Sequence, residues 1–128
     1  METLYNTIKR KKLLFISRHA PYGSSIAKEA LDAILAASAY DQKLSVLFMD
    51  EGVFQLLSAQ DTKDLGQKNF ASMLPAFTHY GIEEIYVHRE SLTKRQITID
   101  ELLLNGIQII DSKAVGSLLS QQDQLLSF

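Results

Sequence analysis

The feature that most constrains the fold is a set of short, nearly continuous apolar runs that end in polar residues. A strand in a half-exposed sheet alternates apolar and polar residues, whereas a strand covered on both faces is apolar throughout. The run at residues 13–16 therefore predicts a buried strand. Further strands are predicted at residues 44–49, 82–88, 107–111 and 125–128.

Between these runs the apolar residues return at helical spacing. The clearest stripe covers residues 26–35, with Ser24 or Ser25 as its N-cap. A last helix is predicted over residues 112–119 with Ser112 as its cap. Shorter or less regular helical segments are predicted at residues 53–57, 70–80 (bent at Pro75 and stopped by Gly81), 90–95 and 100–104, while a surface loop is predicted at residues 59–68.

Strands that alternate with helices indicate a parallel sheet, because a parallel crossover is long enough to hold a helix. We therefore predict an α/β fold, namely a single-domain three-layer α/β/α sandwich with a mainly parallel sheet of about five strands. A chain of 128 residues buries enough surface to form such a domain without disulfides.

The composition excludes several classes of chemistry. The chain has no cysteine, which rules out a disulfide, a thiolate nucleophile or a persulfide on this polypeptide. Its formal net charge is -2, so direct binding of nucleic acid is not expected, and we interpret the basic residues 9–12 as a solvated flank. No apolar stretch approaches the roughly 20 residues of a membrane span, and no secretory signal is visible. We expect a cytoplasmic protein.

Ligands of an open parallel sheet bind beyond the carboxyl ends of its strands. The segments there are residues 17–25, 50–53, 88–91 and 111–113. The first could hold an anion at a helix N-terminus, although Pro21 and Tyr22 replace the small residues that a phosphate loop needs.

The other polar residues at these ends give weaker signals. Asp50 and Glu51 could bind a metal, but adjacent carboxylates alone supply too few converging ligands. The first strand is followed by Ser17 and Arg18 instead of the acidic pair of a receiver domain. The three histidines, at 19, 79 and 88, show no metal-ligand spacing, and a Gly-x-Ser-x-Gly nucleophile elbow is absent. Spacing alone therefore predicts no catalytic site and no cofactor.

Several segments together carry a family resemblance. They are Ala-Pro-Tyr-Gly-Ser at residues 20–24, the helix at 27–36, Asp-Glu-Gly-Val-Phe-Gln-Leu-Leu at 50–57, Tyr-Val-His at 86–88 with Ser-Leu at 91–92, and the final Leu-Leu-Ser-Phe. This pattern resembles the TusC, or DsrF-like, family of sulfur-relay subunits. The resemblance implies a DsrE/DsrF-like α/β domain at residues 12–128 and leaves residues 1–11 as an N-terminal extension.

The resemblance also implies a function. Such subunits form a cytoplasmic, heterohexamer-type complex with TusB-like and TusD-like partners. The complex passes sulfur to a downstream carrier and to the enzyme that makes 2-thiouridine at the tRNA wobble position. In that system the D-type subunit holds the persulfide on a cysteine just after its third strand. His88 stands at the matching position here, and because an imidazole cannot hold a sulfane sulfur, this chain is expected to be noncatalytic.

Two roles then remain open for the subunit. His88, Arg18 and Arg89 have the charge to support the partner's thiolate. Alternatively, the subunit is only architectural, and its apolar residues near 53–57 either form part of an interface or pack on its own sheet. The interface candidates are Val53, Phe54, Leu56 and Leu57. A different class of function is a flavodoxin-like module that binds a nucleotide or another anionic small molecule at residues 17–25.

Overall fold

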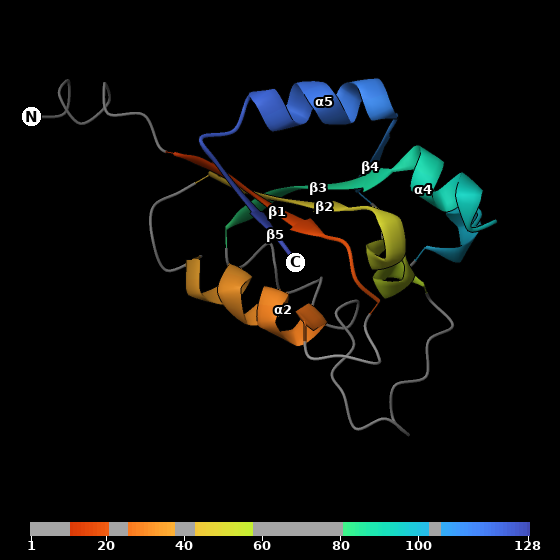
Figure 1. Ribbon diagram of the computed structural model, residues 1–128, viewed down its shortest axis with the longest axis horizontal. Coiled ribbons are helices and arrows are strands. Elements are labelled where there is room, and N and C mark those ends of the chain that lie inside the picture. The colour runs from red at the N-terminus through yellow and green to blue at the C-terminus, as the bar shows by residue number, and fades with distance from the viewer. Residues whose placement is uncertain (1–10, 21–25, 38–42, 58–80, 103–105) are drawn as a thin grey trace, which may run out of the picture.

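The computed structural model describes residues 11–20, 26–37, 43–57, 81–102 and 106–128 (Figure 1). Several predictions therefore lie outside the described residues. They are the N-terminal extension, the caps Ser24 and Ser25, the loop at 59–68, the bent helix at 70–80 with Pro75, and the position of His79.

All five predicted strands are present and form one parallel sheet. Its spatial order is β4-β3-β2-β1-β5, so the first and last strands are neighbours. Phe15 of β1 pairs with Val46 of β2 on one side and with Leu126 of β5 on the other. The strands are β1 (Lys12–Ser17), β2 (Lys43–Phe48), β3 (Ile82–His88), β4 (Ile107–Ile110) and β5 (Gln124–Ser127).

Helices cover both faces of this sheet, which confirms the predicted three-layer α/β/α architecture. Helix α2 (Ile26–Ala37) lies on one face and α5 (Ser112–Ser120) on the other (Figure 1). Shorter segments lie between the strands: the 3-10 helix η1 (Asp50–Leu56) follows β2, the helix α4 (Arg89–Lys94) follows β3, and the 3-10 turn η4 (Ile99–Glu101) lies between α4 and β4.

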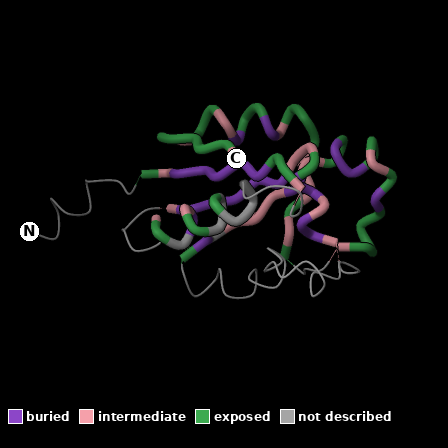
Figure 2. Tube along the Cα trace, turned by 60° about the horizontal axis from the view of Figure 1, so that its bottom comes forward, coloured by how far each residue is buried: buried purple, intermediate pink, exposed green. Residues whose placement is uncertain are grey.

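The continuous apolar runs are explained by the two faces. Leu13 and Phe15 of β1 belong to the core on the side of α2, where Ile34 is fully buried. Leu14 and Ile16 belong to a second core, in which Val115 of α5 packs on the opposite face. Figure 2 shows the buried residues concentrated in the middle of the molecule, where β1 and β2 each have five buried residues in succession. Because successive side chains point to opposite faces, a strand covered on both faces is mostly apolar, and the buried Ser45 of β2 is an exception. The outer strand β5 is exposed along its length.

Two details differ from the sequence prediction. The helical segment predicted at residues 53–57 begins three residues earlier, at Asp50, and it is a 3-10 helix. Val53 and Leu56 are completely buried in the chain's own core, so these two residues cannot form part of an interface; they follow the alternative that the sequence left open.

The cap of α5 also differs. Its N-cap is Asp111, whose side chain accepts a hydrogen bond of 2.8 Å from the amide of Ala114, whereas Ser112 is the first helical residue. Both residues are good caps. Asp111 takes the position because β4 ends one residue earlier, at Ile110.

Candidate functional site

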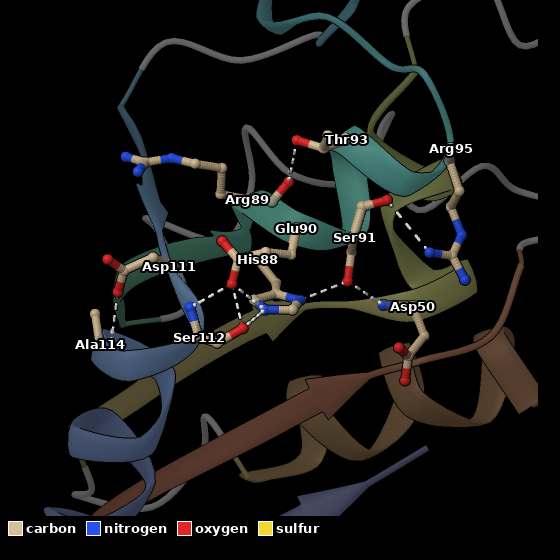
Figure 3. Close-up of polar contacts among 10 residues, drawn as sticks. All are labelled: Asp50, His88, Arg89, Glu90, Ser91, Thr93, Arg95, Asp111, Ser112 and Ala114. Carbon is tan, nitrogen blue, oxygen red and sulfur yellow. Dashed lines mark hydrogen bonds and ion pairs between the residues drawn. The ribbon is translucent and has the colours of Figure 1, made fainter.

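The polar residues that meet at the carboxyl edge of the sheet are grouped around His88 (Figure 3). His88 is the last residue of β3, and α4 follows it directly. Because β3 lies between β2 and β4, the segments after those strands, η1 and α5, approach the same point. The order of the sheet thus collects three chain segments around one imidazole.

Both nitrogens of the His88 ring have partners within this chain. Nδ1 lies 2.6 Å from Oγ of Ser91, and Nε2 lies 2.7 Å from Oγ of Ser112 and 3.1 Å from Oε2 of Glu90. Only 13% of the side chain is exposed. The imidazole is therefore fixed on two sides, by α4 and by the start of α5.

Glu90 is the acidic member of this cluster. Its Oε2 accepts a 2.6 Å hydrogen bond from the backbone amide of Ser112 and a short one from the Ser112 hydroxyl. The hydroxyl hydrogen bond is the main cause that holds the pKa of Glu90 below its ordinary value, and the amide of Ser112 and the neighbouring His88 act in the same direction. Glu90 is accordingly a carboxylate at neutral pH.

Ser91 connects the imidazole to η1. This residue is buried, and its Oγ accepts a 2.9 Å hydrogen bond from the backbone amide of Asp50. Asp50 has φ of 51°, in the left-handed region that few residues other than glycine adopt. The strained turn after β2 thus aims a peptide N–H at the serine that contacts His88.

Arg18 and Arg89, the two predicted supporting cations, lie apart from the imidazole. Nε of Arg18 forms an ion pair of 2.8 Å with Oδ2 of Asp50, and both side chains are well exposed. The side chain of Arg89 points away from the His88 ring (Figure 3). Arg18 therefore reaches the cluster only through Asp50, and Arg89 does not reach it.

The first residues of the predicted anion loop form hydrogen bonds within this chain. Ser17 is buried, and its hydroxyl accepts a 3.2 Å hydrogen bond from Nε2 of Gln55, which also donates to the carbonyl of His19. Residues 21–25 lie outside the described part of the chain. The first hydroxyl of the loop is thus used by a buried glutamine of η1.

The candidate metal carboxylates contact cations of this chain. Asp50 pairs with Arg18, and Oε1 of Glu51 lies 3.7 Å from Nη2 of Arg95. Within the described ranges no three histidine or acidic residues come together in a way that could hold a metal ion.

Sequence reasoning missed three members of the cluster: Glu90, Ser91 and Ser112. They lie within the strand-end segments at 88–91 and 111–113 that the sheet rule selects. What the sequence lacks is the strand order, and only the pairing of β3 with β4 shows that the two segments meet.

The cluster is not a nucleophilic triad, although it holds a serine, a histidine and a glutamate. In such a triad the acid orients the ring nitrogen opposite the one that faces the serine. Here Glu90 and Ser112 contact the same nitrogen, Nε2, and Glu90 also binds Ser112 directly. Ser91 does face the opposite nitrogen, Nδ1, but it is buried, and its oxygen accepts a hydrogen bond from the amide of Asp50, so it is not presented to a substrate. This arrangement fixes the imidazole.

Comparisons with known proteins agree on one family. Residues 11–128 match the model of the DsrE/DsrF-like family. The chain is 39% identical to the intracellular sulfur oxidation protein DsrF of Allochromatium vinosum, over 92% of this chain and 96% of that protein. It is 40% identical to a TusC homolog of Vibrio vulnificus, over 91% of this chain and 98% of that protein.

Solved structures show the same fold. The crystal structure of the ychN protein from E. coli superposes with a TM-score of 0.77 at 22% identity, covering 92% of this chain and 99% of that one. The protein MTH1491 of Methanobacterium thermoautotrophicum, of unknown function, gives a TM-score of 0.65 at 15% identity. In the part of the chain that the structure describes, none of the helices has the length and apolar character needed to cross a bilayer.

Proposed function

Because residues 11–128 match its model, the chain belongs to the DsrE/DsrF-like family, and we propose that it is a noncatalytic subunit of a sulfur-relay complex. One observation carries the proposal: the chain is similar over nine-tenths of its length to proteins named TusC and DsrF, yet it contains no thiol. Sulfur transfer through a persulfide needs a cysteine. That cysteine therefore belongs to a partner.

The proposed complex contains TusB-like and TusD-like subunits in a heterohexamer-type assembly in the cytoplasm. The D-type subunit carries the persulfide, and sulfur continues to a downstream carrier and to the enzyme that thiolates the tRNA wobble uridine. This chain does not itself bind nucleic acid or membrane in the proposal. The net charge of -2 supports that part.

Part of the partner surface is proposed at η1. Phe54 and Leu57 are only partly buried, and both pack against the core beneath them. They are thus the members of the predicted apolar segment that retain surface for a partner. His88 and Arg18 lie at the carboxyl ends of β3 and β1, the two neighbours of β2, which η1 follows. Arg89, next to His88, has an exposed side chain.

A second candidate role is sulfur oxidation, which the similarity to DsrF of Allochromatium vinosum favours. Both roles use the same noncatalytic subunit. The two roles differ in where the sulfur ends, so they can be distinguished by measuring 2-thiouridine in tRNA and sulfur oxidation in the cell.

Coexpression tests the proposed assembly. The chain, produced with its B-like and D-like relatives, is expected to elute as one larger species whose native mass contains all three subunits. Coexpression without this chain is the control. A stable complex of the other two, with this chain eluting alone, would contradict the proposal. In cells that lack the chain, loss of 2-thiouridine from tRNA supports the TusC-like role, whereas intact 2-thiouridine with impaired sulfur oxidation supports the DsrF-like role.

A further inference from the structure

The direction of each hydrogen bond around His88 follows from what its neighbours can donate and accept. Glu90 is ionised, so its Oε2 can only accept. The single hydroxyl proton of Ser112 is given to that oxygen. Towards Nε2 of His88, 2.7 Å away, the Ser112 oxygen can then act only as an acceptor.

Nε2 must therefore carry a proton. A lone pair at this position would face the Ser112 oxygen and the carboxylate of Glu90 at 3.1 Å, and both are acceptors there. The tautomer of a histidine is set by the bonds that its two nitrogens make. On this side of the ring, Glu90 sets it.

The contacts of Nδ1, on the opposite side of the ring, are consistent with a proton on Nε2. Ser91 accepts a hydrogen bond from the backbone amide of Asp50, and a backbone N–H can only donate. Its hydroxyl proton remains for Nδ1 of His88, 2.6 Å away. The hydrogen bonds thus run in one direction, from the amide of Asp50 through Ser91, His88 and Ser112 to Glu90.

We infer that His88 is held with a proton on Nε2, which it donates to Ser112 and Glu90, and that Glu90 is the positioning residue for this arrangement. The position of the proton follows from this chain alone. Its consequence for a partner rests on the proposed function: Nε2 has no lone pair with which to take the proton of a partner's thiol, so His88 does not act there as a base.

The tautomer is tested on the isolated full chain by nitrogen-15 NMR of the histidine rings. At a pH where the ring is neutral, His88 is expected to show one tautomer, with a protonated Nε2 whose proton exchanges slowly with water. Glu90→Ala should give a mixed tautomer and fast exchange, because the Ser112 hydroxyl is then free to donate to Nε2. Glu101→Gln, an exposed glutamate on η4, is the matched control and should leave the His88 signals unchanged.

Two results would overturn the assignment of the proton to Nε2 of His88. One is a wild-type His88 protonated at Nδ1, or mixed between tautomers. The other is a Glu90→Ala protein, with a well-dispersed spectrum, in which His88 keeps the wild-type signature. Neither result depends on any partner, so the sulfur-relay proposal is untouched by them.

The consequence for a partner is tested in the coexpressed complex through the alkylation rate of the partner's thiol against pH. His88→Gln keeps an N–H donor near the position of Nε2 but has no titratable base, whereas His88→Leu has neither. If His88 does not act as a base, folded His88→Gln should keep the wild-type alkylation rate at every pH. A loss of rate in His88→Gln as large as that in His88→Leu would show a base instead.

Discussion

A single carboxylate oxygen holds together two parts of this chain that are 22 residues apart. Oε2 of Glu90, on α4, receives the amide and the hydroxyl of Ser112 at the start of α5, and it lies 3.1 Å from the His88 ring. The amide proton of Ser112 is among those that a helix leaves without an internal acceptor. Glu90 thus acts as an anchor for α5 as well as a partner for His88.

This contact predicts a pH dependence of stability. The pKa of Glu90 is lowered in the folded chain, chiefly by the Ser112 hydroxyl, so the carboxylate stabilises the folded state above its ordinary pKa of 4.5. The contribution is lost as the pH falls through the lower folded value, because the unfolded chain then binds a proton more readily. The difference in unfolding free energy between wild type and Glu90→Gln should therefore shrink below about pH 4.5.

Urea denaturation at a series of pH values measures this difference. The amide proton of Ser112 offers an independent readout, since its NMR shift should follow the titration of Glu90. Glu101→Gln serves as the variant that loses one exposed charge elsewhere. A difference for Glu90→Gln that stays constant with pH would count against the contact.

At the scale of elements, η1 packs closely against the carboxyl end of β1. Its glycine, Gly52, is buried against the end of β1: a Cβ atom built there would lie 1.9 Å from the carbonyl oxygen of Ser17. That carbonyl already accepts a hydrogen bond from the amide of Met49. Moving the two backbones apart would disturb this hydrogen bond between the ends of β1 and β2, so the close approach requires a residue without a side chain.

Replacement of Gly52 by alanine should accordingly destabilise the protein by about 3 kcal/mol. The matched control is Gly116→Ala in α5, where a Cβ would meet no atom within 4 Å. That variant should stabilise by up to about 1 kcal/mol, because alanine is the better helix former. Thermal unfolding of both proteins checks the opposite signs. A Gly52→Ala protein as stable as wild type would mean that η1 packs differently.

Elements could be predicted where local pattern decides, and not where distant segments meet. The apolar runs at 13–16 and 44–49 identify β1 and β2, since only a strand covered on both faces needs them. Whether Asp111 or Ser112 caps α5 depends on whether β4 ends at residue 110 or at residue 111, and local sequence does not resolve a difference of one residue.

The burial of Val53 had two interpretations, because an apolar side chain packs equally well on a core or a partner. Contacts between α4 and α5 depend on strand order, which no local pattern contains.

At the scale of the whole molecule, β5 completes the sheet beside the first strand. Phe128, just after β5, stacks on the buried Phe15 with ring centroids 6.3 Å apart, and its carbonyl accepts a 2.7 Å hydrogen bond from the amide of Arg18. The outer side chains of the strand contribute less, for Leu126 is 43% exposed. The C-terminal strand is thus held mainly by one aromatic ring and by its backbone.

Phe128→Ala is therefore expected to cost about 2 kcal/mol of unfolding free energy, from lost burial and the lost ring pair. Leu126→Ala, in the same strand, should cost less than about 1 kcal/mol. Hydrogen exchange of the β5 amides adds a local readout and should accelerate only in the first variant. Equal costs in the two variants would contradict the assigned role of the Phe15 stack.

The place of β5 next to β1 also has a consequence for synthesis of the chain. Lys12 and Asp123, which are bonded at the start of this strand pair, are 111 residues apart. A ribosome that adds 5–20 residues per second needs roughly 5–20 s to cover that distance. During this time β1 has been made while one of its edges has no strand to pair with. The nascent chain must therefore keep an apolar strand from joining a wrong neighbour until residues 124–127 have been made.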